Sequence, residues 1–376
     1  MTYSGSNYRG SASVPPPDGP KGARVAAAAS GPTRRGLIGS AVGLVVSLAA
    51  AGGGAAVWTT ARNANENLDR PFDLEGIPDE DRPEKLNQAM NLLIIGSDHR
   101  EGHDESDARS DTTILMHVNE GGTEAYGVSI PRDLYVHIPA YAEADYSDTY
   151  AKFNAAYAWG GATLTVMTVE ELTGVRVDHI VEIDFPGLVQ VVDALGGVEM
   201  NIEPADAQGY YDESGVTSIH KPYRFFPAGP NTLNGEEALD YVRQRKQWAR
   251  GDFARMQHQQ ELIKAIMDAA TSTGVLTSQS TLRSFIESVS GAVKVDTEFN
   301  VVETGIDLMG LRSDDLEFMT APNLGTDNIG GESVVVYAWD PENPEESNPE
   351  AVSLWDAIRE DDVRQWIADN SEGEGE

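Results

Sequence analysis

Four arginines and one lysine lie within fourteen consecutive residues, 242–255, in the segment VRQRKQWARGDFAR. The whole chain carries a formal net charge of −34, so these cations are concentrated against the overall charge. Guanidinium groups bind phosphate oxygens through two parallel hydrogen bonds. The segment is therefore either a solvated basic surface or a site that holds an anion, and its composition leaves both interpretations open.

The spacing of these arginines favours a helix end and a new helix start. Arg243 and Arg245 are two residues apart, so their side chains share a face only where the backbone is extended, which predicts a helix end at about Val242. Arg255 falls in the first turn of the next predicted helix, where the positive end of the helix dipole disfavours a cation. An anion bound at this N-terminus would remove that conflict, because free N–H groups and arginines would both bind it.

Charged side chains also gather at the ends of three predicted strands, residues 91–96, 112–118 and 124–130. Asp98 follows the first strand, Arg109 and Asp111 precede the second, and Arg132 and Asp133 follow the third. If the three strands form an antiparallel meander, all of these side chains meet at the same end of the sheet. The strand order thus predicts a polar site at one sheet edge.

Two carboxylates at this edge raise the question of a metal ion. Neighbouring carboxylates disfavour each other's ionised state unless a cation lies between them. Asp98 and Asp111 would suit Mg²⁺, which binds through one or two carboxylates and substrate phosphates. Salt bridges of these two residues with Arg100 and Arg109 are the alternative. A zinc site at the pair of histidines in HREGH, residues 99–103, is disfavoured because the second half of a zinc-protease motif is lacking.

The composition excludes several classes of function. The chain has no cysteine, which excludes disulfides, thiolate metal sites and cysteine nucleophiles. Its acidic charge disfavours nucleic acid as a partner, because that binding depends on neutralising phosphates.

The N-terminal region predicts where the protein resides. Residues 36–61 carry no charge, and roughly 20 residues at 1.5 Å per residue span the hydrocarbon core of a bilayer, so a transmembrane helix is expected. Arg34 and Arg35 directly precede this segment. Their charge favours an orientation in the cell membrane with the N-terminus on the cytoplasmic side and the catalytic domain outside the cell. A cleaved twin-arginine signal peptide is the alternative. In both cases the bulk of the chain leaves the cytosol.

Strands alternate with helices after this segment, which indicates an α/β fold with a mixed central sheet packed between helices. Asn234 and Glu237 form a capping box that begins one helix. Other helices are expected at 152–159, 161–172, 186–195, 253–270, 280–291 and 299–310, further strands at 179–184 and 198–202, and a loop over the sheet at 203–233. The expected divisions are a disordered cytoplasmic tail (1–35), a transmembrane helix (36–61), a stalk (62–89), a catalytic domain (90–325), and an acidic linker with a C-terminal helix and tail (326–376).

Six blocks between residues 90 and 270 resemble, in order, the signature blocks of the LytR-CpsA-Psr (LCP) family. The blocks are NLLIIGSDHR, RSDTTILMHV, SIPRDLYVHIP, KFNAAYAWGG, VDALGGVEMNI and LNGEEALDYVRQR…GDFARMQHQQ. Members of this family are phosphotransferases that act outside the bacterial membrane. The resemblance implies a donor, a polyprenyl-pyrophosphate-linked glycopolymer, and an acceptor, peptidoglycan, which become joined by a phosphodiester.

The resemblance also implies roles for individual residues. Asp98 and Asp111 would hold Mg²⁺, and Asp133 and Asp252 would orient arginines or act as the base, with the choice left open. The pyrophosphate would be bound by Arg109, Arg132, Arg243, Arg245 and Arg255, with Lys152 and Gln259 as further contacts. His258 stands where the family more often has arginine, and no second domain is expected after the catalytic core.

A long prenyl chain needs an apolar tunnel, and the apolar helix expected near residues 185–195 could line one. Two alternative functions remain at this level. A lipid pyrophosphatase would use the same site with water as the acceptor, and a non-catalytic wall-binding protein would not need the acidic pair beside the arginines.

Overall fold

The computed structural model describes residues 65–66, 68–97, 110–142, 144, 148–272, 292–300, 303–304, 308, 311–338, 340 and 347–371. For residues 110, 111, 271, 272 and 371 only the backbone is described. All of these residues belong to one compact unit, Gly36–Glu376.

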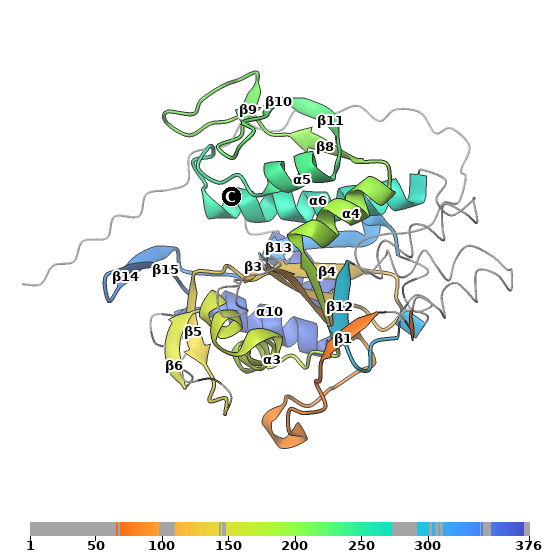
Figure 1. The fold of residues 1–376 in the computed structure, drawn as a ribbon. Helices are drawn as coiled ribbons and strands as arrows, with labels where there is room; N and C mark the ends of the chain where they lie inside the picture. The colour runs from red at the N-terminus through yellow and green to blue at the C-terminus, as the bar shows by residue number, and fades with distance from the viewer. Residues whose placement is uncertain are drawn as a thin grey trace, which may run out of the picture. The chain divides into compact units, whose positions relative to one another are not determined.

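A seven-stranded mixed sheet forms the centre of this unit (Figure 1). Its strands, in spatial order, are β1 (Asp69–Phe72), β12 (Val293–Asp296), β7 (His179–Asp184), β2 (Met90–Ser97), β3 (Ser110–Val118), β4 (Ala125–Ser129) and β13 (Leu316–Thr320). The pairs β2–β3 and β3–β4 are antiparallel, whereas β7–β2 and β4–β13 are parallel. The mixed α/β fold and the meander of three strands predicted from the sequence are therefore confirmed.

Side chains of neighbouring positions in β2 alternate between the two faces of this sheet. Leu92 and Ile94 belong to one apolar core, together with Ile114 of β3. Leu93 and Ile95 belong to a second core on the other face. This alternation follows from the two-residue period of a strand, and both faces are apolar because helices cover both.

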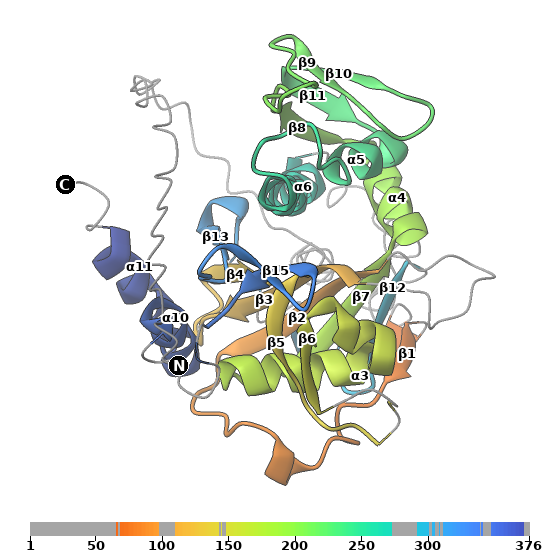
Figure 2. The ribbon, with the colours of Figure 1, turned by 90° about the vertical axis from the view of Figure 1, so that its left-hand side faces the viewer.

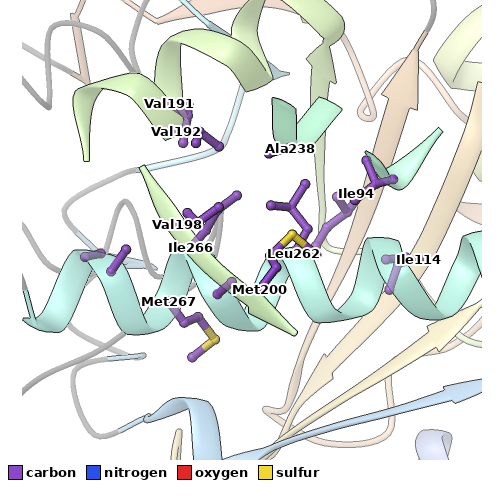
Figure 3. Close-up of a cluster of buried hydrophobic side chains, with 14 of the residues drawn as sticks. Ile94, Ile114, Val191, Val192, Val198, Met200, Ala238, Leu262, Ile266 and Met267 are labelled. Carbon is purple, nitrogen blue, oxygen red and sulfur yellow. The ribbon is translucent and has the colours of Figure 1, made fainter. Parts of the chain in front are cut away.

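Three helices cover the first face: α4 (Phe185–Ala194), α5 (Gly235–Val242) and α6 (Asp252–Ser272). Figure 3 shows Leu262 and Ile266 of α6 gathered with Val191 of α4 and Ile94 of β2 between the helices and the sheet. These helices hold the cationic segment 242–255 above one edge of the sheet.

The second face is covered by α3 (Asn154–Thr173), α10 (Pro349–Glu360) and α11 (Val363–Ser371). A four-stranded sheet lies beside α3, in the order β14 (Thr326–Ile329), β15 (Glu332–Val336), β5 (Leu134–Ile138), β6 (Thr149–Lys152) (Figure 2). Helix α3 is broken at Gly160 and Gly161, where the sequence predicts two helices; Gly161 has φ +62°. A Cβ atom on Gly160 would lie 2.5 Å from Leu164 Cβ, so the break needs glycine.

The expectation of a loop over the sheet at residues 203–233 is wrong. This region contains β9 (Gly215–Thr217), β10 (Phe225–Pro227) and β11 (Gly229–Leu233), which pairs with β8 (Val198–Ile202). Figure 1 places these strands on the far side of α5 and α6 from the central sheet. Strands β9 and β10 have three residues each, which is too short for a periodic pattern to reveal them, and β11 begins with Gly229 and Pro230, residue types that are uncommon in strands.

The predicted stalk and the predicted end of the catalytic domain also need correction. Strand β1 joins the central sheet, and Leu74 and Ile77 are buried in its second core. At the other end, β15 pairs with β5, and Leu354 of α10 reaches the same core. The C-terminal region holds two helices rather than one, separated by Asp361 with φ +61°. Residues on both sides of 90–325 thus belong to the fold.

The short 3-10 helices are Asp79–Asp81 and Ser313–Asp315. The predicted tail (1–35), the transmembrane helix (36–61), the helix at 280–291 and most of the helix at 299–310 lie outside the described residues. Within the described part of the chain, no helix is long and apolar enough to cross a membrane.

Candidate functional site

Three strand ends meet at one edge of the central sheet. Ser97 at the end of β2 pairs with Ser110 at the start of β3, and β4 ends toward the same edge, with Ser129 opposite Ile114 of β3. This register places the backbone of Asp111 next to the end of β2. Asp98, Arg109 and the side chain of Asp111 lie outside what the structure describes, so their convergence remains a prediction.

The connection between α5 and α6 is built by two local signals. The predicted capping box is present: Asn234 Oδ1 accepts a hydrogen bond from the Glu237 backbone N–H at 3.0 Å, and Glu237 Oε2 accepts one from the Asn234 N–H at 3.0 Å. Helix α5 ends at Val242, as its arginine spacing predicts. Gly251, with φ +56°, then turns the chain into α6, a conformation that glycine adopts without strain.

Asp252, the first residue of α6, is surrounded by three guanidinium groups. Its carboxylate lies 3.0 Å from Arg255 Nη2, 3.3 Å from Arg245 Nε and 3.7 Å from Arg132 Nη2. Arg255 is 5% exposed, and Asp252 offsets its conflict with the helix dipole. One carboxylate shared by three arginines leaves positive charge at this helix N-terminus.

A second carboxylate continues the cluster toward β6. Lys152 Nζ lies 3.2 Å from Asp133 Oδ1, and Arg132 Nε lies 3.8 Å from Asp133 Oδ2. Glu332 Oε2 is 3.8 Å from Lys152 at the solvent-exposed rim. Four cations, Arg132, Lys152, Arg245 and Arg255, therefore surround two inner carboxylates, Asp133 and Asp252. We call these six residues the cation cluster.

Arg243 lies in a different environment from Arg245. Its guanidinium is 4.3 Å from the ring centroid of Phe185, and it lines an apolar cavity of about 90 Å³ between α4, α5, α6 and the central sheet. Arg245 lines an open groove instead. The expectation that an extended backbone places both side chains on one face is wrong, because Arg243 keeps helical backbone angles.

The apolar cavity agrees with the expectation that the helix at 185–195 could line a tunnel. Phe185, Leu188 and Val191 of α4 all line it, together with Ile263 of α6. Gln259 is one of its few polar residues, and no described residue donates a hydrogen bond to its buried Oε1 atom. Gln259 is thus placed beside Arg243 rather than in the cation cluster.

The open groove begins at the cation cluster and has a volume of about 850 Å³. Its remaining lining comes from β5, β6, the start of α3 and the β14–β15 hairpin: Tyr135, Tyr150, Ala151, Asn154, Ala155, Ala158, Trp159, Ile329, Gly330, Glu332, Ser333 and Val334. The sequence analysis missed this groove. One signal for it exists, because Tyr135 and His137 alternate with the buried Leu134 and Val136 and so face away from the core.

His258 is a core residue and not a substitute for a ligand-binding arginine. It is fully buried, between the rings of Tyr241 (4.8 Å between centroids) and Trp248 (4.4 Å). Its Nε2 atom lies 3.1 Å from Glu203 Oε2. The hydrogen bond with His258, aided by the nearby Arg250, lowers the pKa of Glu203 below its usual value although partial burial opposes this.

The described residues contain no group of three or more His, Asp or Glu side chains arranged to hold a metal ion. The side chains of the predicted pair Asp98 and Asp111 are not among those that the structure describes. The magnesium site therefore remains a prediction. The strand register alone is compatible with it, because Asp111 is the second residue of β3 and lies where β2 ends.

A family model decides the relationship of this chain to known proteins. The LytR_cpsA_psr family model matches residues 55–348. This chain belongs to the LytR_cpsA_psr family. The resemblance found in the six sequence blocks is thereby confirmed.

Curated relatives in the family carry cell-wall names. The cell wall biosynthesis protein LcpA of Corynebacterium glutamicum is 30% identical over 286 residues, which cover 66% of this chain and 53% of that protein. The polyisoprenyl-teichoic acid–peptidoglycan teichoic acid transferase TagU of Oceanobacillus iheyensis is 30% identical over 267 residues, covering 69% of this chain and 77% of TagU. TagT of Bacillus subtilis, named for the same transfer, is 39% identical over 188 residues, covering 49% of this chain and 53% of TagT. The chain spans about half the length of LcpA and of TagT.

Solved structures share the architecture. The structure of TagT bound to LIIa-WTA matches with a TM-score of 0.56 at 26% identity, covering 77% of this chain and 98% of TagT. A crystal structure from Streptococcus agalactiae matches with a TM-score of 0.59 at 23% identity, covering 73% of this chain and 87% of that one, which shows a common fold. The mixed central sheet between helices is therefore the LytR_cpsA_psr architecture.

For a member of this family, the described part of the predicted site divides into two groups. Arg132, Asp133, Lys152, Arg245, Asp252 and Arg255 come together in the cation cluster. Arg243 and Gln259 line the apolar cavity instead. Whether any of these residues binds a pyrophosphate stays a prediction.

Proposed function

We propose that this protein is a membrane-anchored phosphotransferase that moves a glycopolymer from a polyprenyl-pyrophosphate carrier to peptidoglycan and forms a phosphodiester link. The observation that carries the proposal is that one short segment borders two different spaces: Arg243 lines the apolar cavity, and Arg245 of the cation cluster, two residues further on, lines the open groove. A lipid pyrophosphate has an apolar chain joined to a strongly anionic head, and this arrangement offers a matching environment to each part.

The chemistry of the transfer is electrostatic. The acceptor hydroxyl oxygen forms a bond to the sugar-side phosphorus, while the bond from that phosphorus to the bridging oxygen breaks and polyprenyl phosphate leaves. Arg132, Arg245 and Arg255 would stabilise the charge that develops on the phosphoryl oxygens, because fixed cations need no reorganisation during the reaction. The hydroxyl proton passes to a carboxylate.

Asp133 is the better placed of the two candidate bases. It lines the groove from which an acceptor would approach, and its nearest described cation is Lys152. Asp252 does not line the groove. Its carboxylate is surrounded by three arginines, which hold it in place. We therefore assign the base to Asp133 and assign Asp252 the positioning of the arginines.

Asp98 and Asp111 would hold Mg²⁺, whose charge would add to that of the arginines on the pyrophosphate oxygens. The prenyl chain would enter the apolar cavity beside Arg243. At about 90 Å³ this cavity holds only a short part of such a chain, so α4 and α6 would separate when the lipid binds. Gln259 would then accept a hydrogen bond from bound water or ligand through its buried Oε1 atom.

Product analysis tests the proposal. The full chain is incubated with Mg²⁺, a synthetic polyprenyl-pyrophosphate-linked disaccharide and peptidoglycan glycan strands. The expected products are polyprenyl phosphate and a phosphodiester-linked disaccharide on the glycan, and excess chelator should abolish both. Free disaccharide phosphate without linked product would identify a pyrophosphatase, and no product at all would favour a wall-binding protein.

Membrane placement needs a separate experiment. If residues 36–61 anchor the chain with its N-terminus inside, protease added to intact spheroplasts should digest residues after 62 and spare residues 1–35. Release of a soluble mature protein would instead support a cleaved signal peptide.

A further inference from the structure

The groove beside the cation cluster has an aromatic floor that the phosphate chemistry does not use. In the antiparallel pair β5–β6, Tyr135 is opposite Lys152 and His137 is opposite Tyr150, so these four side chains share one face. The rings of Tyr135 and Tyr150 stack with centroids 5.9 Å apart, and His137 lies 5.1 Å from Tyr150. Tyr150 nevertheless remains 41% exposed, toward the groove.

Trp159 adds a third ring to the same groove, from the last residue of α3 before its break at Gly160. Asn154, Ser333 and Glu332 supply hydrogen-bonding groups to its lining. Sugars present an apolar C–H face surrounded by hydroxyl groups. Tyrosine and tryptophan offer large, rigid, amphipathic surfaces at low entropic cost, so rings with a polar rim suit a glycan.

The placement of this groove distinguishes between the two glycans of the reaction. The groove and the apolar cavity share no lining residue, and the cation cluster contributes to the groove only. In-line transfer requires the attacking hydroxyl to approach opposite the leaving polyprenyl phosphate. Because the lipid is assigned to the apolar cavity, the attacking glycan is expected in the groove.

We propose that the groove floored by Tyr135, Tyr150 and Trp159 is the binding site for the acceptor glycan strand, whose hydroxyl it presents to Asp133. This inference rests on the proposed function, and it adds a carbohydrate-binding surface formed by β5, β6, α3 and the β14–β15 hairpin. Its volume of about 850 Å³ lies within the range of roughly 300–1,000 Å³ that is common for ligand sites.

Two binding measurements on the full chain test it. One titrates a peptide-free peptidoglycan oligosaccharide, and the other titrates geranylgeranyl pyrophosphate. Tyr150→Ala should weaken oligosaccharide affinity at least about tenfold, as truncation of a central aromatic contact commonly does, and leave pyrophosphate affinity within about twofold. Tyr150→Phe, which keeps the ring, should bind the oligosaccharide nearly as well as the unchanged protein.

Tyr211→Ala serves as the matched control, because Tyr211 is 65% exposed in the region before β9 and does not line the groove. It should leave both affinities unchanged. Equal oligosaccharide affinity in Tyr150→Ala and in the unchanged protein, or tight binding of the donor disaccharide in place of the acceptor strand, would overturn the inference. Absence of pyrophosphate binding by the unchanged protein would instead contradict the proposed function, so the two failures are distinguishable.

Discussion

Arg245 and Arg250 lie in the same connection between α5 and α6 and are equally accessible, with side chains 46% and 45% exposed. Arg250 is paired with Glu203, a carboxylate that it shares with the buried ring of His258 and not with another arginine of this segment: its Nη2 atom donates to both oxygens of Glu203 at 2.9 Å. Arg245 shares Asp252 with Arg132 and Arg255. The same residue type in one loop is thus neutralised at one end and left in excess at the other.

This difference separates arginines that support the fold from arginines that can bind a ligand. Arg82 and Glu170 are the most buried example of the first kind, with side chains 6% and 2% exposed. Arg82 also donates to the carbonyl of Val177, and Glu170 accepts from the Val177 N–H, so little bonding capacity is left over. Accessibility alone would not have distinguished the two kinds, whereas the ratio of cations to carboxylates does.

The largest effect is expected where a dedicated pair is broken. Arg82→Ala leaves Glu170 buried without its cation, so the free energy of unfolding should fall by about 3–5 kcal/mol. Chemical denaturation followed by circular dichroism measures this. Arg176→Ala, which removes an exposed pair with Asp79, is the control and should change stability little. Equal free energies of unfolding for the two variants would mean that the buried pair stabilises the fold no more than the exposed pair does.

A smaller effect on stability and a larger one on binding are expected where the carboxylate is shared. Arg245→Ala should weaken geranylgeranyl pyrophosphate about tenfold to a hundredfold, because a charge-assisted hydrogen bond contributes about 1.5–3 kcal/mol. Arg250→Ala has the same change in side chain and a similar exposure, and should alter affinity by less than about twofold. Calorimetric titration of both variants decides the comparison. Equal losses would make the whole segment a general basic surface.

The smallest effect concerns acid stability at Glu203. Its pKa is lowered in the folded state, so below its usual value of about 4.5 the unfolded state binds more protons. The stabilisation is therefore complete above that value and is lost as pH falls through the folded pKa. Glu203→Gln should melt below the unchanged protein at about pH 7, and the difference should shrink toward about pH 3. A constant difference in melting temperature across this range would contradict the assignment.

Much of the fold that positions the site was predictable because its signals are local. The apolar run of β2, the strand that ends at Val118 and the Asn234 capping box each depend on a few neighbouring residues. Strands such as β1 and β12 were not found, since their pairing joins Asp69 to Lys294 and no local pattern encodes a partner so distant. The short strands β9 and β10 were missed for a different reason, because three residues are too few to show a periodic pattern.

The charged residues of the site could be predicted from the sequence, whereas their arrangement and the shape of the groove could be predicted only in part. The predicted helix end at Val242 is confirmed, although the extended backbone from which it was argued is absent at Arg243. The place of Asp252 among the arginines was expected from the family resemblance and not from the arginine spacing. The separation of Arg243 from Arg245 could not be predicted, since it depends on Phe185 in a distant helix. The aromatic groove was missed because Tyr135 and Trp159 line one groove only when β5 and α3 pack together.

The pairing of β1 with β12 has a consequence for the order in which the protein folds. Arg70 of β1 donates to the carbonyls of Asp296, Thr297 and Phe299, the first of them 226 residues further along the chain. As the chain is synthesised from its N-terminus, β1 must wait until that distant segment has emerged. Until then β7 is an edge strand with unpaired N–H and C=O groups, open to pairing with other chains. Such distant contacts slow folding, so this protein should depend on protection from aggregation until its synthesis is nearly complete.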